Sequence, residues 1–141
     1  MSNPAHAVFY LNEYLFAKEK GLEIDFDVDN IEIEHIMPSS GKNIEGVRTE
    51  ADMSKDEFDE YVNKLGNKIL LEKKINGRIS DKWFSLKKQN SINNKRDCGY
   101  VDSKFPIAFS LTEYPKEQWT KDDIDLATEK AAERIVTYIF D

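Results

Sequence analysis

The chain has 141 residues, of which 40% are hydrophobic, and its formal net charge is −7. This length allows one compact core, so we expect a single domain over residues 1–141. There is no apolar run long enough to span a membrane and no secretion-signal pattern at the N-terminus, so we expect a soluble cytoplasmic protein. The single cysteine, Cys98, excludes an intramolecular disulfide, and together with His6 and His35 it cannot form a structural zinc site. Any bound metal would therefore be held mostly by oxygen atoms.

The charges are unevenly distributed along the chain. The segment from Lys64 to Arg96 has a net charge of +8, whereas residues 1–63 sum to −10 and residues 97–141 to −5. The overall negative charge argues against a nucleic-acid partner, because phosphate binding depends on Lys and Arg. The basic segment reverses that argument, although a solvated helix face would explain it equally well if it stood alone.

The first predicted elements are a helix and a strand. Pro4 at a first helical position and Gly21 as a stop delimit a helix over about residues 3–20. Alternating apolar and polar residues over 29–36 predict a strand that ends before Pro38. Neighbouring residues on this strand, Glu34 and His35 among them, should point to opposite faces.

A polar loop, a second helix and a second strand are expected next. The loop runs to about Met53, after which Ser54 caps a helix that Gly66 should end. The apolar run at residues 67–71 predicts a short strand. The resulting order is a strand, a long insertion and a strand.

The second half of the chain is predicted to contain a turn and two helices. Asn76-Gly77 is a turn dipeptide, and a basic helix should start after residues 80–81. Residues 105–111 are a possible buried segment. The final helix, over about residues 120–140, should bury an apolar stripe from Ile124 to Ile139.

Three short motifs occur in a characteristic order. They are Ile-Glu-His-Ile-Met-Pro at residues 33–38, Leu-Gly-Asn-Lys-Ile-Leu-Leu at residues 65–71, and Asn76 followed by Phe84 and Lys87. This arrangement resembles the HNH, or His-Me finger, nuclease motif, and more narrowly the C-terminal nuclease domain of GmrSD-type restriction endonucleases. The resemblance implies an α+β fold in which a ββα-metal core, about residues 28–90, is flanked by N- and C-terminal helices.

The resemblance also implies a role for four residues. His35 matches the general base, and an imidazole suits this role because its ordinary pKa leaves it largely neutral yet basic at cellular pH. Glu34 and Asn76 match the ligands of one divalent cation, and such oxygen donors favour Mg²⁺ or Mn²⁺ over zinc. Asn67 matches the middle Asn of the catalytic motif, which ties the loop to the strand pair and orients the histidine.

The function implied by the resemblance is metal-dependent cleavage of DNA, as a nick or a double-strand break, in restriction and defence against phage. The chain would be the effector domain of a larger protein, with DNA and an N-terminal NTPase or sensor domain or subunit as partners. Basic residues on and before the helix that follows the metal turn could contact DNA phosphates. They are Arg78, Lys82, Lys87 and Lys88, and Lys68 on the second predicted strand could add a further phosphate contact.

Other interpretations of these residues remain open. The chain could be a catalytically inactive HNH-like module that binds DNA or protein, or a purely structural interaction module. Trp83 and Phe84 are expected to be core anchors rather than platforms for base stacking. His6 and Cys98 lie outside all three motifs and are given no role.

Overall fold

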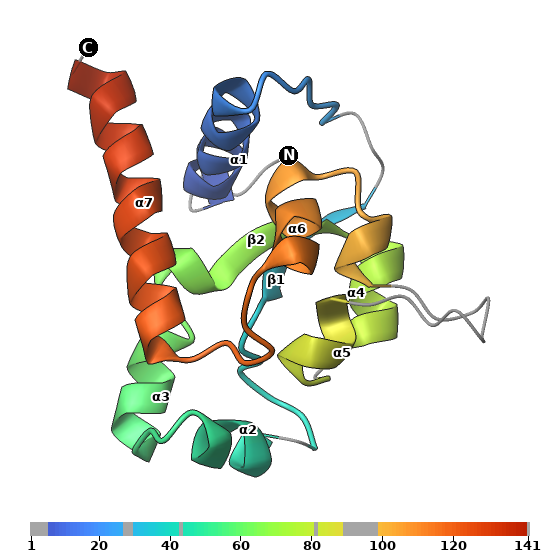
Figure 1. Ribbon diagram of the computed structural model, residues 1–141, viewed down its shortest axis with the longest axis vertical. Helices are drawn as coiled ribbons and strands as arrows, with labels where there is room; N and C mark the ends of the chain where they lie inside the picture. The colour runs from blue at the N-terminus through green and yellow to red at the C-terminus, as the bar shows by residue number, and fades with distance from the viewer. Residues whose placement is uncertain (1–5, 27–29, 43, 81, 89–98, 141) are drawn as a thin grey trace.

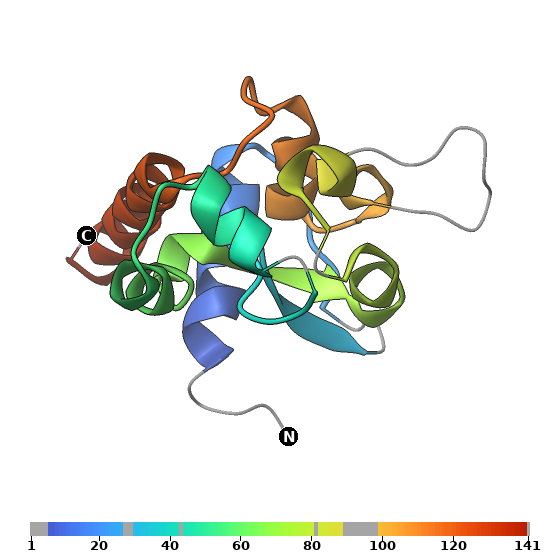
Figure 2. The ribbon, with the colours of Figure 1, turned by 90° about the horizontal axis from the view of Figure 1, so that it is seen from below.

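A two-stranded antiparallel sheet lies at the centre of the computed structural model, which describes residues 6–26, 30–42, 44–80, 82–88 and 99–140 (Figure 1). Helices surround this sheet, so the fold is α+β, as expected. The described elements, including three short 3-10 helices labelled η, are α1 Ala7–Glu19, β1 Ile31–His35, α2 Ile44–Glu50, α3 Lys55–Tyr61, η2 Leu65–Asn67, β2 Lys68–Glu72, α4 Lys73–Ile79, α5 Phe84–Lys88, η3 Tyr100–Asp102, α6 Pro106–Ser110, η4 Leu111–Glu113 and α7 Lys121–Phe140. Seen from below, α7 and α3 lie on one side of the sheet and α4 and α5 on the other (Figure 2).

The register of the sheet fixes the position of the sequence motifs. Glu34 of β1 pairs with Ile69 of β2, and His35 pairs with Lys68. The pairing continues one residue further, because the Ile36 backbone N–H donates to the Asn67 carbonyl at 2.9 Å. The first two motifs therefore lie side by side at the end of β1, and both predicted strands are confirmed.

Two helices confirm the predicted start and stop signals in part. Helix α1 ends at Glu19, and Gly21 follows with a positive φ of +68°, which a glycine adopts without strain. Helix α3 begins after Ser54, whose side chain accepts a hydrogen bond from the Glu57 N–H in a capping box. It ends at Tyr61, earlier than predicted.

Gly66 has a different role from the helix stop that the sequence suggested. A Cβ atom at Gly66 would lie 2.4 Å from the Thr128 backbone nitrogen and 2.5 Å from the Ile124 carbonyl oxygen. The Gly66 N–H also donates to the Thr128 hydroxyl at 2.9 Å. The glycine therefore allows α7 to pack directly against the backbone of η2.

Two predictions of irregular structure were wrong. The polar loop contains α2, whose Val47 is buried. Asn76-Gly77 lies inside helix α4 and forms no turn, because Ile75 and Ile79 lie one helical turn apart and are both buried, an interaction stronger than the local turn preference.

The C-terminal half closes the core. The segment 105–111, which contains helix α6, is buried only in part: Phe105, Ala108 and Leu111 are buried, whereas Phe109 is 47% exposed. Helix α7 buries Ile124 and Ala131, but Tyr138 and Ile139 are 55% and 60% exposed, so the predicted stripe does not continue to the last turns. No helix in the described part of the chain has both the length and the apolarity needed to cross a membrane.

Candidate active site

A cleft of about 480 Å³ opens at the end of β1. It brings together Glu34, His35 and Asn76, although Asn76 follows Glu34 by 42 residues in the sequence. The other side of the cleft is the loop 38–42, which the sequence analysis did not assign to the site. The cleft therefore unites the candidate base with both candidate metal ligands.

His35 is the titratable imidazole of this cleft. The residue is half-buried at the last position of β1. Burial, together with the positive charges of Lys68 and Lys87, lowers the pKa of His35 below its ordinary value. The imidazole is therefore neutral at neutral pH, which is the state that accepts a proton.

Glu34 belongs to the cleft and to a buried polar cluster beneath it. Its Oε2 atom accepts hydrogen bonds from the Lys87 ammonium and the Tyr100 hydroxyl, each at 3.0 Å. Burial raises the pKa of the Glu34 carboxyl, while the ammonium and the hydroxyl favour its charged form. Burial and the Glu34 carboxylate raise the pKa of Tyr100 well above its ordinary range, so Tyr100 is a neutral donor.

Lys87 is fully buried, so the expectation that it contacts DNA was wrong. Besides Glu34, its ammonium donates to the backbone carbonyls of His35, at 2.9 Å, and Ile36, at 3.0 Å. These three bonds attach α5 to the strand end that carries the histidine. Lys87 is thus placed to hold the position of His35 from below.

Lys88 was also wrongly expected to face DNA. Its side chain is only 6% exposed, and its ammonium donates to the backbone carbonyls of Tyr114, at 2.8 Å, and Lys116, at 2.9 Å. Sequence alone cannot distinguish such a buried lysine from a surface one, because the difference depends on carbonyl groups that lie about 26 to 28 residues away.

Asn67 has the tying role that was expected of it. Its side chain is fully buried and makes four hydrogen bonds. The amide oxygen accepts from the Met37 N–H at 2.7 Å and from the Trp119 indole at 3.2 Å, and the amide nitrogen donates to the carbonyls of Met37 and Val62. These bonds fix the chain just after His35 against η2.

Asn76 projects from α4 toward β1. Its amide nitrogen donates to the Glu32 carboxylate at 2.9 Å, so the amide oxygen is the atom that can face a cation. Within the described residues, no group of three or more His, Cys, Asp or Glu side chains could hold a metal. A cation in this cleft would depend on the Asn76 oxygen and the Glu34 carboxylate. Such oxygen donors suit Mg²⁺ or Mn²⁺, and water molecules would complete the coordination shell of the cation.

The other predicted DNA contacts do not converge on the cleft. Lys68 lies on β2 beside the ring of Phe9, Lys82 is half-buried next to Trp83, and Arg78 is exposed on α4. Lys42 is the exposed cation that lines the cleft, and the sequence analysis missed it because it stands in a polar loop outside the motifs.

The residues given no catalytic role are placed as follows. Phe84 packs against Tyr114 and Trp119, with ring centroids 5.8 Å and 5.4 Å away, and is a core anchor as predicted. His6 is exposed at the start of α1. Cys98 lies outside the described residues.

The antiparallel strands β1 and β2, followed by α4, with a histidine, a glutamate and an asparagine lining one cleft, are compatible with a ββα nuclease core. The chain matches the family described as GmrSD restriction endonucleases, C-terminal domain, over residues 2–134, and it belongs to this family. The comparisons with curated proteins and with solved structures gave no match. Membership of the family makes the chain a nuclease domain of the restriction endonuclease type, with DNA as its substrate.

Proposed function

We propose that this domain is a metal-dependent DNA endonuclease of the HNH type and the effector part of a larger restriction protein. One observation carries the proposal: His35, Glu34 and Asn76 line the same cleft. The lowered pKa of His35 supports it, because a general base must be unprotonated when the attacking water approaches.

In the proposed reaction, the neutral His35 imidazole accepts a proton from water as the water oxygen attacks the phosphorus of a DNA phosphodiester. The bond from phosphorus to the bridging oxygen breaks, and that oxygen leaves with the electron pair and is protonated by solvent. Lys87 and Asn67 keep the histidine in place through the backbone on either side of Ile36. Their contribution is positional, since neither side chain reaches the cleft surface.

Glu34 and Asn76 are the residues proposed to hold one divalent cation, Mg²⁺ or Mn²⁺. When bound, such a cation supplies positive charge against the phosphate and the leaving oxygen. The Glu32 carboxylate orients the Asn76 amide for this role by accepting its N–H at 2.9 Å. Lys42, at the edge of the cleft, is proposed to contact the DNA backbone.

The negative charge of the remaining surface limits the affinity of this domain for DNA. Residues 1–63 sum to −10 and residues 97–141 to −5. We therefore propose that an N-terminal NTPase or sensor domain or subunit recruits the DNA, and that the isolated domain cuts slowly.

The proposal is tested by incubating supercoiled plasmid with the purified domain in Mg²⁺ or Mn²⁺, with EDTA as the metal control. His35→Ala should abolish nicking, whereas His6→Ala, which removes the exposed histidine of α1, should nick like the wild-type domain. Intact plasmid at high enzyme concentration, or equal cleavage by His35→Ala, would contradict the assignment of His35.

A DNA-binding domain that does not cut is the second candidate. The specific support for this candidate is the Glu34 carboxylate, whose Oε2 atom already accepts hydrogen bonds from the Lys87 ammonium and the Tyr100 hydroxyl. This candidate predicts salt-sensitive DNA binding that is the same with and without EDTA. Metal-dependent nicking would exclude it.

A further inference from the structure

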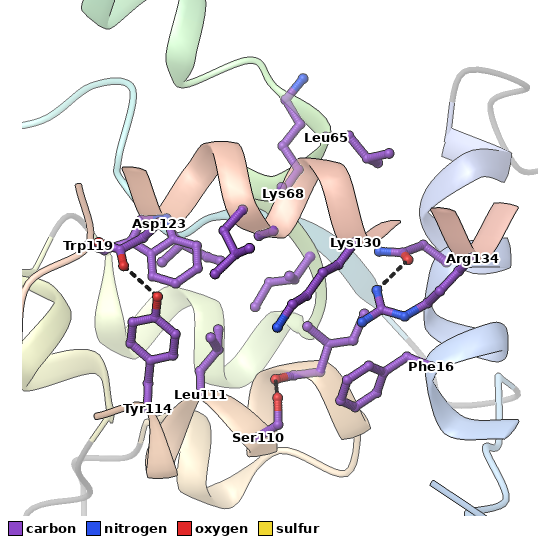
Figure 3. A pocket seen from close by; sticks show the side chains of 17 residues that line it. Phe16, Leu65, Lys68, Ser110, Leu111, Tyr114, Trp119, Asp123, Lys130 and Arg134 are labelled. Carbon is purple, nitrogen blue, oxygen red and sulfur yellow. Dashed lines mark hydrogen bonds between the residues drawn. The ribbon is translucent and has the colours of Figure 1, made fainter. Parts of the chain in front are cut away.

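A separate cavity of about 200 Å³ lies behind the sheet, between α1, the α6–η4 segment and α7 (Figure 3). Its walls are mainly apolar and include Phe16, Ile69, Leu111 and Trp119. None of the proposed metal ligands, nor His35, lines it. The cavity is thus a site distinct from the cleft.

Three cations and one carboxylate line this cavity. The carboxylate, Asp123, is already bonded to Tyr114, Lys116 and Thr120. Arg134 is bonded to Glu19 and Asn12. The charges inside the cavity that remain to be balanced therefore come from lysines.

Lys68 and Lys130 are these lysines. Neither ammonium has a hydrogen bond or an ion pair among the described residues. The Lys68 ammonium lies over the ring of Phe9, 5.8 Å from the ring centroid. Figure 3 shows Lys130 extending from α7 over the space between Leu111 and Phe16. An apolar cavity with such a lysine at its opening is complementary to an organic anion whose body is apolar.

The size of the cavity limits the ligand further. A drug-sized molecule or a nucleotide needs a pocket of roughly 300–1,000 Å³, whereas a cavity of about 150 Å³ accepts benzene. This space therefore fits about six to ten carbon atoms with one anionic group outside them. From the cavity, its walls and its lysines, we infer that the domain binds a small monocarboxylate with an aromatic or branched apolar body.

The cavity walls make direct contact with the residues that position the histidine. Ile36 follows His35 in the chain, and the indole of Trp119 donates to the Asn67 amide oxygen at 3.2 Å. A ligand in the cavity therefore touches Trp119, whose fluorescence reports on binding. The inference concerns binding alone and does not rest on the proposed nuclease function.

The test is a titration with 3-phenylpropionate and with its neutral counterpart, 3-phenylpropanamide. The chain contains two tryptophans, so Trp83→Phe leaves Trp119 as the only reporter. We expect a saturable change in Trp119 fluorescence with a dissociation constant on the order of 0.1–1 mM for the carboxylate. The melting temperature of the unsubstituted chain should begin to rise once the carboxylate concentration exceeds this dissociation constant, and it should continue to rise at higher concentrations.

Two cavity variants and one matched control identify the site. Ala127→Leu should fill the cavity and abolish saturable binding. Lys130→Gln, at an exposed position, should weaken carboxylate binding about five- to tenfold and leave amide binding unchanged. Lys55→Gln makes the same change of charge at an exposed position of α3 and should have no effect.

Three results would overturn the inference. They are the absence of any saturable signal at millimolar ligand, equal binding of the amide and the carboxylate, and equal weakening by Lys55→Gln and Lys130→Gln. Because no DNA is present, failure of the nuclease proposal would leave these measurements unaffected.

Discussion

Two regions meet at the end of β1, and they differ in burial. In the open cleft, His35 and Asn76 are half-buried and Lys42 is exposed, whereas Lys87 and Tyr100 in the cluster beneath are fully buried. Removing a group from the cleft leaves its surroundings accessible to water, but removing one from the cluster leaves buried polar partners unsatisfied. The cleft should therefore govern chemistry, and the cluster should govern both geometry and stability.

The strongest effect on stability is expected for Lys87→Met. The variant keeps the length of the side chain but leaves the Glu34 carboxylate buried without its ammonium partner. Breaking a buried ion pair in this way should cost about 3–5 kcal/mol of unfolding free energy. Urea unfolding followed by circular dichroism measures the change.

Two controls sharpen this comparison. Lys82→Met, at a half-buried lysine outside the cluster, should change the unfolding free energy by less than about 1 kcal/mol. The double variant Glu34→Leu/Lys87→Met removes both charges and should recover much of the loss. A cost for Lys87→Met no larger than that for Lys82→Met would show that the cluster does not stabilise the fold.

A second buried carboxylate, Glu13, should make stability depend on pH. Burial, which outweighs the hydrogen bond from the Ile107 N–H, raises the pKa of Glu13 from 4.5 to about 8. The folded state therefore binds the proton more tightly than the unfolded state does. The resulting stabilisation is complete below pH 4.5 and is lost as the pH rises from 4.5 to about 8, a change on the order of 4 kcal/mol at most.

Glu13→Gln tests this dependence, because glutamine can still accept the Ile107 N–H but does not titrate. The variant should gain stability relative to the wild-type chain between pH 5 and pH 8.5, as measured by urea unfolding. Glu23→Gln, at an exposed position after α1, should keep the wild-type slope. Parallel pH profiles for wild type and Glu13→Gln would refute the raised pKa.

The smallest effects are expected from two glycines, and they have opposite signs. Gly66→Ala forces a Cβ atom to within 2.4 Å of the Thr128 backbone nitrogen and should cost about 1–3 kcal/mol. Gly77→Ala, inside α4 with no atom within 4 Å of the new Cβ, should stabilise the domain by about 0.5–1 kcal/mol. Thermal unfolding of both variants distinguishes the steric effect of close packing by α7 at Gly66 from a general destabilisation by glycine-to-alanine substitution.

Local patterns predicted the parts of the fold that depend on neighbouring residues. The alternation in β1 and the capping box at Ser54 were sufficient to place a strand and a helix. The Asn76-Gly77 turn prediction failed because packing of Ile75 and Ile79 outweighed the preference of the dipeptide. Local signals therefore fail where burial decides the conformation.

The candidate site followed the same rule. The motif order was enough to select His35, Glu34 and Asn76, and the structure brings them to one cleft. The sequence could not show that Lys87 is buried, because its partners include backbone carbonyls 51 and 52 residues away. Lys42 was missed because a lysine in a polar loop has no distinguishing spacing.

The most direct test of this account is the single-turnover nicking rate of supercoiled plasmid, measured together with the melting temperature of each protein. For His35→Ala and Asn76→Ala in the cleft, we predict rates at least about 100-fold below wild type with melting temperatures close to that of wild type. His6→Ala should match wild type in both measurements. Unchanged rates in the cleft variants would contradict the claim that this cleft cuts DNA.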